Sequence, residues 1–455
     1  MNNLSGVNAL DSESINVFIQ SLPVSSKYIL AVSGGIDSIV LAHLFSQVSD
    51  IQNKNILIVY IDHGLNEHSA EWGESCAEWS KKIGFKFEYI KVNSRPEKGE
   101  SVEAWARKVR YDCLMSLMQK DAILFTAHHQ NDQVETLLLR LFRGAGTRGV
   151  SAMQLCRPFS EGLHIRPLLN ITRADIRAYA DLKQLSCIED PSNQDIKLDR
   201  NYLRHSVLPI INKRWPAFLK TIARFIANQQ ETSMLLDDVG HDDMSEVVDI
   251  KTRTIIVSKL KLLSLPRQKN LLLYFCRISE LATPNQVHLQ QLLNELLTAD
   301  EDKEPLVTWS NVEARRYRDR LYIKLSNELL GLPEQSDLSV NQAIKLDDES
   351  LKLIASQGKG VKADIINNHK ISVRFKKGGE KIKPFNQNMT KTLKQLFQEK
   401  GVLPWKRERY PLIYIDDELA VVPGICIAHS FAANEYEAGF IIHWTGFEKV
   451  VQSND

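Results

Sequence analysis

Four short β-branched runs alternate with amphipathic stretches in the N-terminal third of the chain, and this alternation restricts the fold more than any other feature. The runs cover residues 28–33, 55–62, 85–92 and 122–129, and a stretch of helical periodicity follows each of them. Such alternation predicts a parallel sheet with helices on both faces. We therefore expect an α/β fold with a doubly wound parallel sheet, whose ligands bind beyond the carboxyl ends of the strands.

The chain has 455 residues, which is more than one core holds, and its pattern changes along its length. We expect the α/β domain to cover residues 1–214. Residues 215–325 contain several long helical stretches and predict a mainly helical domain. Residues 326–370 are polar and irregular and indicate a linker region, and residues 371–455 predict a small α+β domain.

Charge and cysteine content exclude several classes of protein. The formal net charge is only +1, so a nucleic-acid site has to come from local clustering of basic residues. None of the six cysteines forms a C-x-x-C pair, which disfavours a zinc ribbon, an iron–sulfur cluster and a dithiol redox site. Scattered cysteines, no apolar run near roughly 20 residues and no secretory signal pattern predict a cytoplasmic protein that does not bind membranes.

A glycine pair separates the first expected strand from the helix after it, within the segment SGGIDS from Ser33 to Ser38. Glycine adopts positive φ angles and lets phosphate oxygens approach the backbone, and the following helix N-terminus supplies free N–H donors. The two serines add hydroxyl groups. The segment therefore predicts a phosphate-binding loop, although an ordinary turn between a strand and a helix also fits this stretch alone.

Two common phosphate-binding motifs are absent from this turn. G-x-x-x-x-G-K-[ST] requires a lysine after the glycines, and G-x-G-x-x-G requires a third glycine. The carboxylate of Asp37 is placed to hold Mg²⁺ against phosphates, and an acid at a helix N-terminus is the alternative interpretation.

The fourth expected strand leads into AHHQNDQVET, residues 127–136. Asp132 and Glu135 are three residues apart on one expected helix, so they share a face. Their carboxylates suit Mg²⁺ binding or proton transfer, and a solvated helix face is the alternative. His128 and His129 have no further His or Cys at ligand spacing, so we interpret them as a polar strand end instead of a metal site.

Taken together, these segments resemble one enzyme family. S-G-G-x-D-S resembles the pyrophosphate loop (PP-loop) of the N-type ATP pyrophosphatases, and H-H-x-x-D-Q-x-E-T after it resembles the tRNA(Ile)-lysidine synthases. Further segments resemble that family in the same order: DHGLN (62–66), EAWARKVRY (103–111), RGAGTRGVSAM (143–153), EDPSNQDIKLDRNYLRHSVLP (189–209) and the basic stretch 373–414.

The resemblance implies an adenine nucleotide α-hydrolase-like fold and an ATP-dependent ligase active in tRNA modification. The family adenylates the C2 oxygen of the wobble cytidine in the CAU anticodon of tRNA(Ile). The ε-amine of free L-lysine then attacks C2 and AMP leaves, and the product lysidine converts AUG to AUA decoding. The implied substrates are ATP, L-lysine and tRNA(Ile), with Mg²⁺ as cofactor; whether the protein is a homodimer is left open.

The resemblance also assigns residues. It implies catalytic roles for Asp37, Asp132, Glu135 and Arg200, with the first two near Mg²⁺ and Glu135 near the lysine amine as a base. It implies an ATP-binding loop of Ser33, Gly34, Gly35, Ile36, Asp37 and Ser38. Expected tRNA or phosphate contacts are Arg107, Arg110, Arg204, Lys376, Lys377, Lys394 and Arg407. A basic helix face is the alternative for Arg107 and Arg110.

The C-terminal domain offers a separate argument for nucleic-acid binding. Residues 374–409 contain eleven Lys or Arg against three Glu, with Phe375, Phe385 and Trp405 among them. Basic clusters with aromatic residues suit a phosphate backbone. A solvated surface is the alternative interpretation.

Three other functions stay open at this point. An amidotransferase-type synthetase with the same loop needs an ammonia-generating region, which we do not find in the sequence. A tRNA thiolase normally has paired or catalytic cysteines. A tRNA-binding protein without activity has no need of the intact loop, Asp132 and Glu135.

Overall fold

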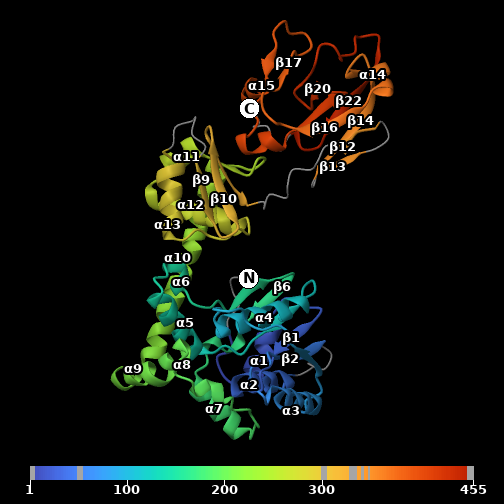
Figure 1. Ribbon diagram of the computed structural model, residues 1–455. Helices are drawn as coiled ribbons and strands as arrows, with labels where there is room; N and C mark the ends of the chain where they lie inside the picture. Colours follow the sequence, from blue (N-terminus) through green and yellow to red (C-terminus); the bar gives the residue numbers. More distant parts are fainter. Residues whose placement is uncertain are drawn as a thin grey trace. The chain divides into compact units, whose positions relative to one another are not determined.

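The computed structural model describes residues 6–48, 55–298, 305–326, 336–339, 343–346 and 349–447. The chain forms two compact units, residues 1–236 and 237–455 (Figure 1). Within the described ranges, no helix has the length and apolar character needed to cross a bilayer.

The first unit is built around a six-stranded sheet of order β3-β2-β1-β4-β6-β5. Strands β1 to β4 and β6 run parallel, and β5 is antiparallel to β6. This confirms the expected parallel sheet and adds an antiparallel edge strand. The strands are β1 (Tyr28–Ala31), β2 (Ile56–Asp62), β3 (Lys86–Lys91), β4 (Ile123–Phe125), β5 (Cys156–Phe159) and β6 (Gly162–Ile165).

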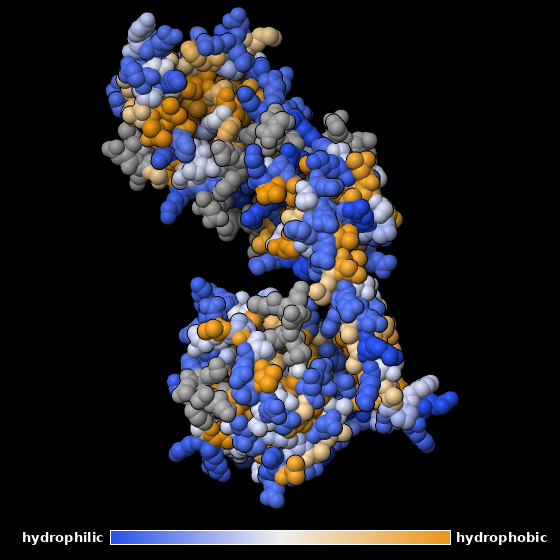
Figure 2. Space-filling model, turned by 180° about the vertical axis from the view of Figure 1, so that it is seen from behind, coloured by the Kyte–Doolittle hydropathy of each residue, from blue (hydrophilic) through white to orange (hydrophobic). Residues whose placement is uncertain are grey.

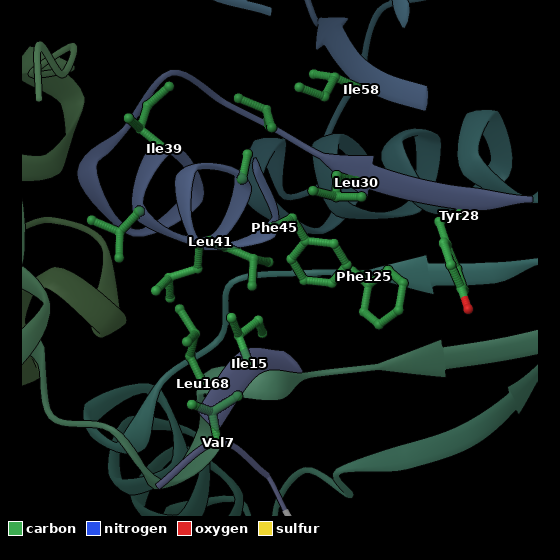
Figure 3. Packing of buried hydrophobic residues seen from close by; sticks show 14 of the residues in the cluster. Val7, Ile15, Tyr28, Leu30, Ile39, Leu41, Phe45, Ile58, Phe125 and Leu168 are labelled. Carbon is green, nitrogen blue, oxygen red and sulfur yellow. The ribbon is translucent and has the colours of Figure 1, made fainter. Parts of the chain in front are cut away.

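Alternate residues of the central strands face opposite sides of this sheet, as the period of two requires. Leu30, Ile58 and Phe125 belong to the larger core, which Figure 3 shows around Phe45. This core lies under α1 (Ser12–Gln20), α2 (Ile36–Ser46), α3 (Ser69–Lys82) and α7 (Arg173–Leu182).

The opposite face of the sheet has a smaller core. Ile29, Leu57 and Leu124 pack there with Leu114 of α4 (Val102–Ser116). Helices therefore cover both faces, and the doubly wound arrangement is confirmed.

The sheet has a topological switch point at β1. The chain passes from β1 to β2 and β3 on one side and then returns to form β4 on the other side of β1. Loops that leave the carboxyl ends of two such strands diverge, and the crevice between them is where ligands bind in folds of this kind. The glycine turn follows β1, and α5 (Gln130–Phe142) follows β4.

Helix α10 (Phe218–Val247) contains the boundary between the units. The residues after it form α11 (Val257–Leu262), α12 (Leu265–Ile278), α13 (Gln286–Gln291) and η5 (Leu292–Leu296). A five-stranded antiparallel sheet packs with them: β7 (Val248–Asp249), β8 (Thr254–Ile256), β11 (Arg320–Leu325), β10 (Val312–Tyr317) and β9 (Leu306–Trp309). The region expected to be mainly helical thus has a sheet as well.

The C-terminal part of the second unit has two main sheets around one core. One contains β12 (Ser336–Asp337), β16 (Ile371–Phe375), β19 (Pro411–Ile415), β20 (Glu418–Val422) and β21 (Cys426–Ile427). The other contains β13 (Ile344–Leu346), β14 (Glu349–Gln357), β22 (Ala438–Trp444) and β15 (Val361–Lys362). Two-stranded β17 (Lys381–Ile382) and β18 (Lys391–Thr392) and the helices α14 (Ala363–Asn368), α15 (Leu393–Glu399) and η6 (Pro404–Arg409) complete it.

The second half of the expected linker differs from the prediction. Residues 349–357 form β14, which pairs along its whole length with β22. Alternate residues of β14, such as Leu351 and Leu353, are buried, so this segment belongs to the C-terminal core. The linker positions 327–335, 340–342 and 347–348 lie outside the described residues.

Apolar side chains also gather on one face of this C-terminal part (Figure 2). This part also has a hollow of about 400 Å³, lined by residues of β20, β21 and β22, by Phe385 and by residues 358–360, 424, 425, 432 and 433.

Candidate active site

The glycine turn connects β1 to α2 in a compact form. Gly34 has a φ of +80°, which L side chains rarely adopt. Gly35 is the N-cap of α2 and has no side chain to cap the first turn. Ser33 donates its backbone N–H to Ser38 Oγ at 3.2 Å, and that hydroxyl donates to the Gly35 carbonyl at 2.8 Å. Backbone N–H groups at such an uncapped helix start suit phosphate oxygens.

Gly34 leaves no room for a side chain. A Cβ atom there would clash with Cδ1 of Ile188 and lie 3.3 Å from Sγ of Cys76. We expect Gly34→Ala to lower the free energy of unfolding by about 1–3 kcal/mol, because it adds strain at a positive φ to overpacking. Urea unfolding of the variant measures this loss.

Gly35→Ala is the matched control for that measurement. Gly35 has a φ of −68°, and a Cβ atom there would lie 3.5 Å from Ser33 Oγ, an ordinary contact. Its unfolding free energy should fall by less than that of Gly34→Ala and by no more than about 1 kcal/mol, the usual cost of alanine at an N-cap. Equal stabilities of the two alanine variants would contradict the steric account of Gly34.

Asp37, the second residue of α2, has a carboxylate oxygen without a partner. Its Oδ1 is buried and makes no hydrogen bond among the described residues. It lies 3.6 Å from Nε2 of His129, beyond the usual range of a hydrogen bond. Burial raises the pKa of Asp37, and Asp132 adds to this effect while His129 opposes it. A buried acceptor without a donor costs free energy, so this oxygen is a candidate cation ligand.

Asp132 and His129 form a capping box at the start of α5. Oδ2 of Asp132 accepts the backbone N–H of His129 at 3.0 Å, and Nδ1 of His129 accepts the N–H of Asp132 at 3.3 Å. Nε2 of His129 therefore carries the proton of the neutral ring and lies within 3.6 Å of both carboxylates. Burial opposes the charge of Asp132, but His129 and Arg200 outweigh it and hold the pKa of Asp132 below its ordinary value.

Glu135 lies between two arginines, with its side chain 0% exposed. Arg200 Nε donates to its Oε2 at 2.6 Å, Arg204 Nε donates to its Oε1 at 2.7 Å, and Arg204 Nη2 donates to Oε2 at 2.9 Å. Arg200 Nη2 also donates to Oδ1 of Asp132 at 2.9 Å. Two carboxylates and two guanidinium groups thus form one buried network.

Local sequence explains why the two arginines meet Glu135. They lie four residues apart in one continuous helical stretch, made of α8 (Asp199–Tyr202), the π-helical turn η4 (Leu203–Val207) and α9 (Leu208–Arg214). That spacing puts both guanidinium groups on one face. Leu208 packs with Val134 of α5 and Phe218, which holds this stretch against the helix that carries the carboxylates.

The structure brings together five of the site residues expected from the sequence: Asp37, Asp132, Glu135, Arg200 and Arg204. The SGGIDS loop joins this group through Asp37, the second residue of α2, which begins at Ile36. Arg107 and Arg110 stay outside this network. Both are exposed on α4, and the guanidinium of Arg107 lies over the ring of Tyr111 at 5.2 Å.

The expected tRNA contacts of the C-terminal part lie on separate elements. Lys376 and Lys377 follow β16, and Lys394 belongs to α15. Lys377 and Lys394 are exposed. Arg407 is half-buried in η6 and donates from Nε to the carbonyl of Val402 at 3.0 Å, so part of its guanidinium is already used in packing.

Sequence reasoning missed His129 as a site residue. The His-His pair was interpreted as a polar strand end, and His129 turns out to be fully buried between the two aspartates. The usable signal was the spacing His129-x-x-Asp132 before an apolar periodic stretch, which is the pattern of a capping box.

Three families of protein domains match the chain in succession. The PP-loop domain matches residues 9–211, the TilS substrate binding domain residues 257–322 and the TilS substrate C-terminal domain residues 371–444. A solved structure of the U34-tRNA thiolase NcsA from Methanococcus maripaludis covers 47% of this chain and 74% of its own, at 16% identity and a TM-score of 0.39. Similarity this low does not bear on function.

Curated relatives match almost the whole chain. The tRNA(Ile)-lysidine synthase of Coxiella burnetii is 36% identical over 94% of this chain and 95% of its own. The enzyme of the same name from Legionella pneumophila is 34% identical over 94% of this chain and 97% of its own, and that from Methylococcus capsulatus is 32% identical over 95% and 99%. With its PP-loop and both further domains in this order, the chain belongs to the tRNA(Ile)-lysidine synthase family, whose members are ATP-using ligases.

Proposed function

We propose that this protein joins free L-lysine to C2 of the wobble cytidine in the CAU anticodon of tRNA(Ile), at the crevice between β1 and β4. ATP adenylates the C2 oxygen and pyrophosphate leaves; the lysine ε-amine then forms the C–N bond, and AMP leaves with the oxygen. The observation that carries this proposal is the uncapped SGGIDS turn after β1, whose Asp37 lies beside His129 and Asp132 after β4 at the switch point. The reaction belongs in the cytoplasm, where tRNA is available.

The turn suits the leaving pyrophosphate. Adenylation requires the developing negative charge to be stabilised by fixed donors. Gly34, Gly35 and Ile36 supply backbone N–H groups and Ser33 a hydroxyl group for this purpose, while the Ser38 hydroxyl stabilises the turn by donating to the Gly35 carbonyl.

Asp37 is the residue that best fits Mg²⁺. Carboxylate oxygens are the ligands this ion prefers, and Oδ1 of Asp37 is buried without a partner among the described residues. Both oxygens of Asp132 already accept hydrogen bonds, from Arg200 and from the backbone of His129, so Asp132 fits a direct ligand position less well. Bound Mg²⁺ would neutralise phosphate charge.

Glu135 suits a positioning role better than the role of a base expected from the sequence. A base needs a carboxylate oxygen that can take up a proton from the substrate, and both oxygens of Glu135 accept from arginines. We propose that Glu135 holds Arg200 and Arg204 in place and that these arginines face the nucleotide or the anticodon.

The cysteines support this function over the tRNA thiolase alternative. All six lie within the described residues and none is in a disulfide. Burial raises the pKa of every one of these thiols, that of Cys76 to about 11 and that of Cys276 to about 12. A thiol that acts as a nucleophile needs a lowered pKa.

Lysine incorporation tests the proposed function. With ATP and Mg²⁺, radiolabelled lysine should enter tRNA(Ile) that carries a CAU anticodon, with AMP and pyrophosphate as products. Methionine tRNA with the same anticodon is the control for specificity. Absence of label from correctly folded tRNA(Ile), with protein that binds ATP, would show that the function is a different one.

The basic residues of the C-terminal part should contribute to tRNA binding. We expect Lys376→Ala, Lys377→Ala and Lys394→Ala together to reduce the affinity for tRNA about tenfold or more at low salt, and to lower the slope of log affinity against log salt. Filter binding over a salt series measures both. Lys359→Ala is the control, because Lys359 lies outside the basic stretch 374–409. Arg409→Ala is not a suitable control, because Arg409 belongs to that stretch. Unchanged affinity of the triple variant would identify the cluster as a solvated surface.

A further inference from the structure

A series of buried polar side chains leads from two arginines to His128, the residue before the cap of α5. His164 of β6 is fully buried. Nη2 of Arg166 lies 3.1 Å from Nδ1 of His164, and Nε of Arg157 donates to the same nitrogen at 3.4 Å. Guanidinium groups can only donate. Nδ1 of His164 therefore has no proton, and the neutral ring is protonated at Nε2.

The hydroxyl group of Thr126 links His164 to His128, so the tautomer of His164 also fixes the tautomer of His128. Nε2 of His164 and Nδ1 of His128 each lie 2.8 Å from Oγ1 of Thr126. The hydroxyl oxygen accepts the proton from His164, so the hydroxyl's own proton is directed to Nδ1 of His128. The neutral ring of His128 then carries its proton on Nε2.

Both rings are held in the neutral form. Burial and the nearby Arg166 together lower the pKa of His128 to about 3 and that of His164 to about 2, although Asp132 opposes the shift at His128. Arg166 itself is buried, and its Nη1 donates to the carbonyl of Gln154 at 2.7 Å. The positive charge at the start of the series is therefore fixed in place.

His128 leaves the same edge of the sheet as the glycine turn. β4, which ends at Phe125, pairs with β1, which ends at Ala31, and His129, the next residue after His128, lies 3.6 Å from Asp37 of that turn. Among the residues that the structure describes, the bond with Thr126 is the one hydrogen bond of the His128 ring. Nε2–H of His128 is thus left for a ligand.

We infer that His128 donates a hydrogen bond from Nε2 to a phosphate oxygen of the bound nucleotide, in a tautomer imposed by Thr126 and His164. The inference rests on the proposed function, since it takes the SGGIDS turn to be the phosphate site. The Nε2–H group of a neutral imidazole stabilises a phosphate oxygen through a hydrogen bond and adds no positive charge to the site. Thr126 and His164 are positioning residues, because they act on the ligand only through His128.

Nitrogen-15 NMR of protein labelled at its twelve histidines tests the tautomer in the absence of ligand. Protonated and unprotonated ring nitrogens have well-separated shifts, and the His128→Gln spectrum identifies the His128 signals. We expect His128 of the wild type to be protonated at Nε2. Thr126→Val, which has the same shape without the hydroxyl, should give a mixture of tautomers, and Thr126→Ser should retain the wild-type form. A wild-type ring protonated at Nδ1 would overturn the inference.

Addition of ATP and Mg²⁺ tests the contact, with calorimetry as the measure of binding. We expect the Nε2 signal of His128 to shift on binding, and the affinity for ATP to fall about tenfold in His128→Ala and in Thr126→Val but not in Thr126→Ser. ATP binding without a change at His128 would overturn this inference and leave the proposed function intact. Failure of ATP to bind the wild type would overturn both. The wild-type readouts stand even if Thr126→Val does not fold.

Discussion

Replacing Glu135 by alanine should abolish lysidine formation and also lower the free energy of unfolding of the first unit by about 3–5 kcal/mol. The carboxylate is fully buried and accepts three hydrogen bonds from Arg200 and Arg204. Its removal leaves two partly buried guanidinium groups with Asp132 as their remaining shared partner. Urea unfolding and the rate of lysine incorporation measure the two losses.

Two further variants make this result interpretable. Glu78→Ala removes an exposed glutamate of α3 and should change stability by no more than about 0.5 kcal/mol. Glu135→Gln keeps the shape but not the charge, so its stability should fall between those of Glu135→Ala and the wild type. An inactive Glu135→Ala protein with wild-type stability would instead indicate that Glu135 acts on the substrate as a base.

Asp37→Asn should reduce turnover about 100- to 1,000-fold while the unfolding free energy stays equal to that of the wild type or rises. Oδ1 of Asp37 has no donor among the described residues, and burial raises the pKa of Asp37. A neutral amide therefore removes the cost of a buried charge. It also removes the carboxylate proposed to hold Mg²⁺ at the pyrophosphate.

The pH dependence of stability provides a second test of Asp37. Since its pKa in the folded state is raised, the folded protein binds the proton more tightly than the unfolded chain. Stability from this group is present at acid pH and is lost as pH rises from about 4 through the raised pKa. The free energy of unfolding of the wild type should lose this contribution as the pH rises, and that of Asp37→Asn should not. Asp181→Asn, an exposed change in α7, is the control, and a large loss of stability in Asp37→Asn would contradict the assignment.

The parallel sheet could be predicted because its central strands are continuous apolar runs, such as ILIVYID in β2. Such runs are typical of strands that are buried on both faces. The hairpin of β5 and β6 could not, because Cys156–Phe159 contains Arg157 and Pro158 and lacks a clear alternation. Strand β14 was placed in a linker for a related reason. Its outward residues are polar apart from Ile354, and its partner β22 lies more than 80 residues later in the chain.

The candidate site, like the fold, could be predicted from the sequence only in part. The spacing of Asp132 and Glu135 correctly places them on one face of one helix, because that depends only on helix geometry. Whether this face is solvated or buried depends on Arg200, 65 residues beyond Glu135. No local pattern contains that information. The resemblance suggested the function of these residues, but not that the arginines occupy both oxygens of Glu135.

The pairing of β14 with β22 determines where the C-terminal part can be cut from the rest of the chain. A fragment that begins at Ile371 keeps every basic residue from Arg374 to Arg409 but loses both neighbours of β22, β14 and β15. Unpaired strand edges recruit other chains and lead to aggregation. Engineers who want this basic module alone, for grafting or for tRNA capture, should therefore start it ahead of Ile344, so that the four-stranded sheet remains whole.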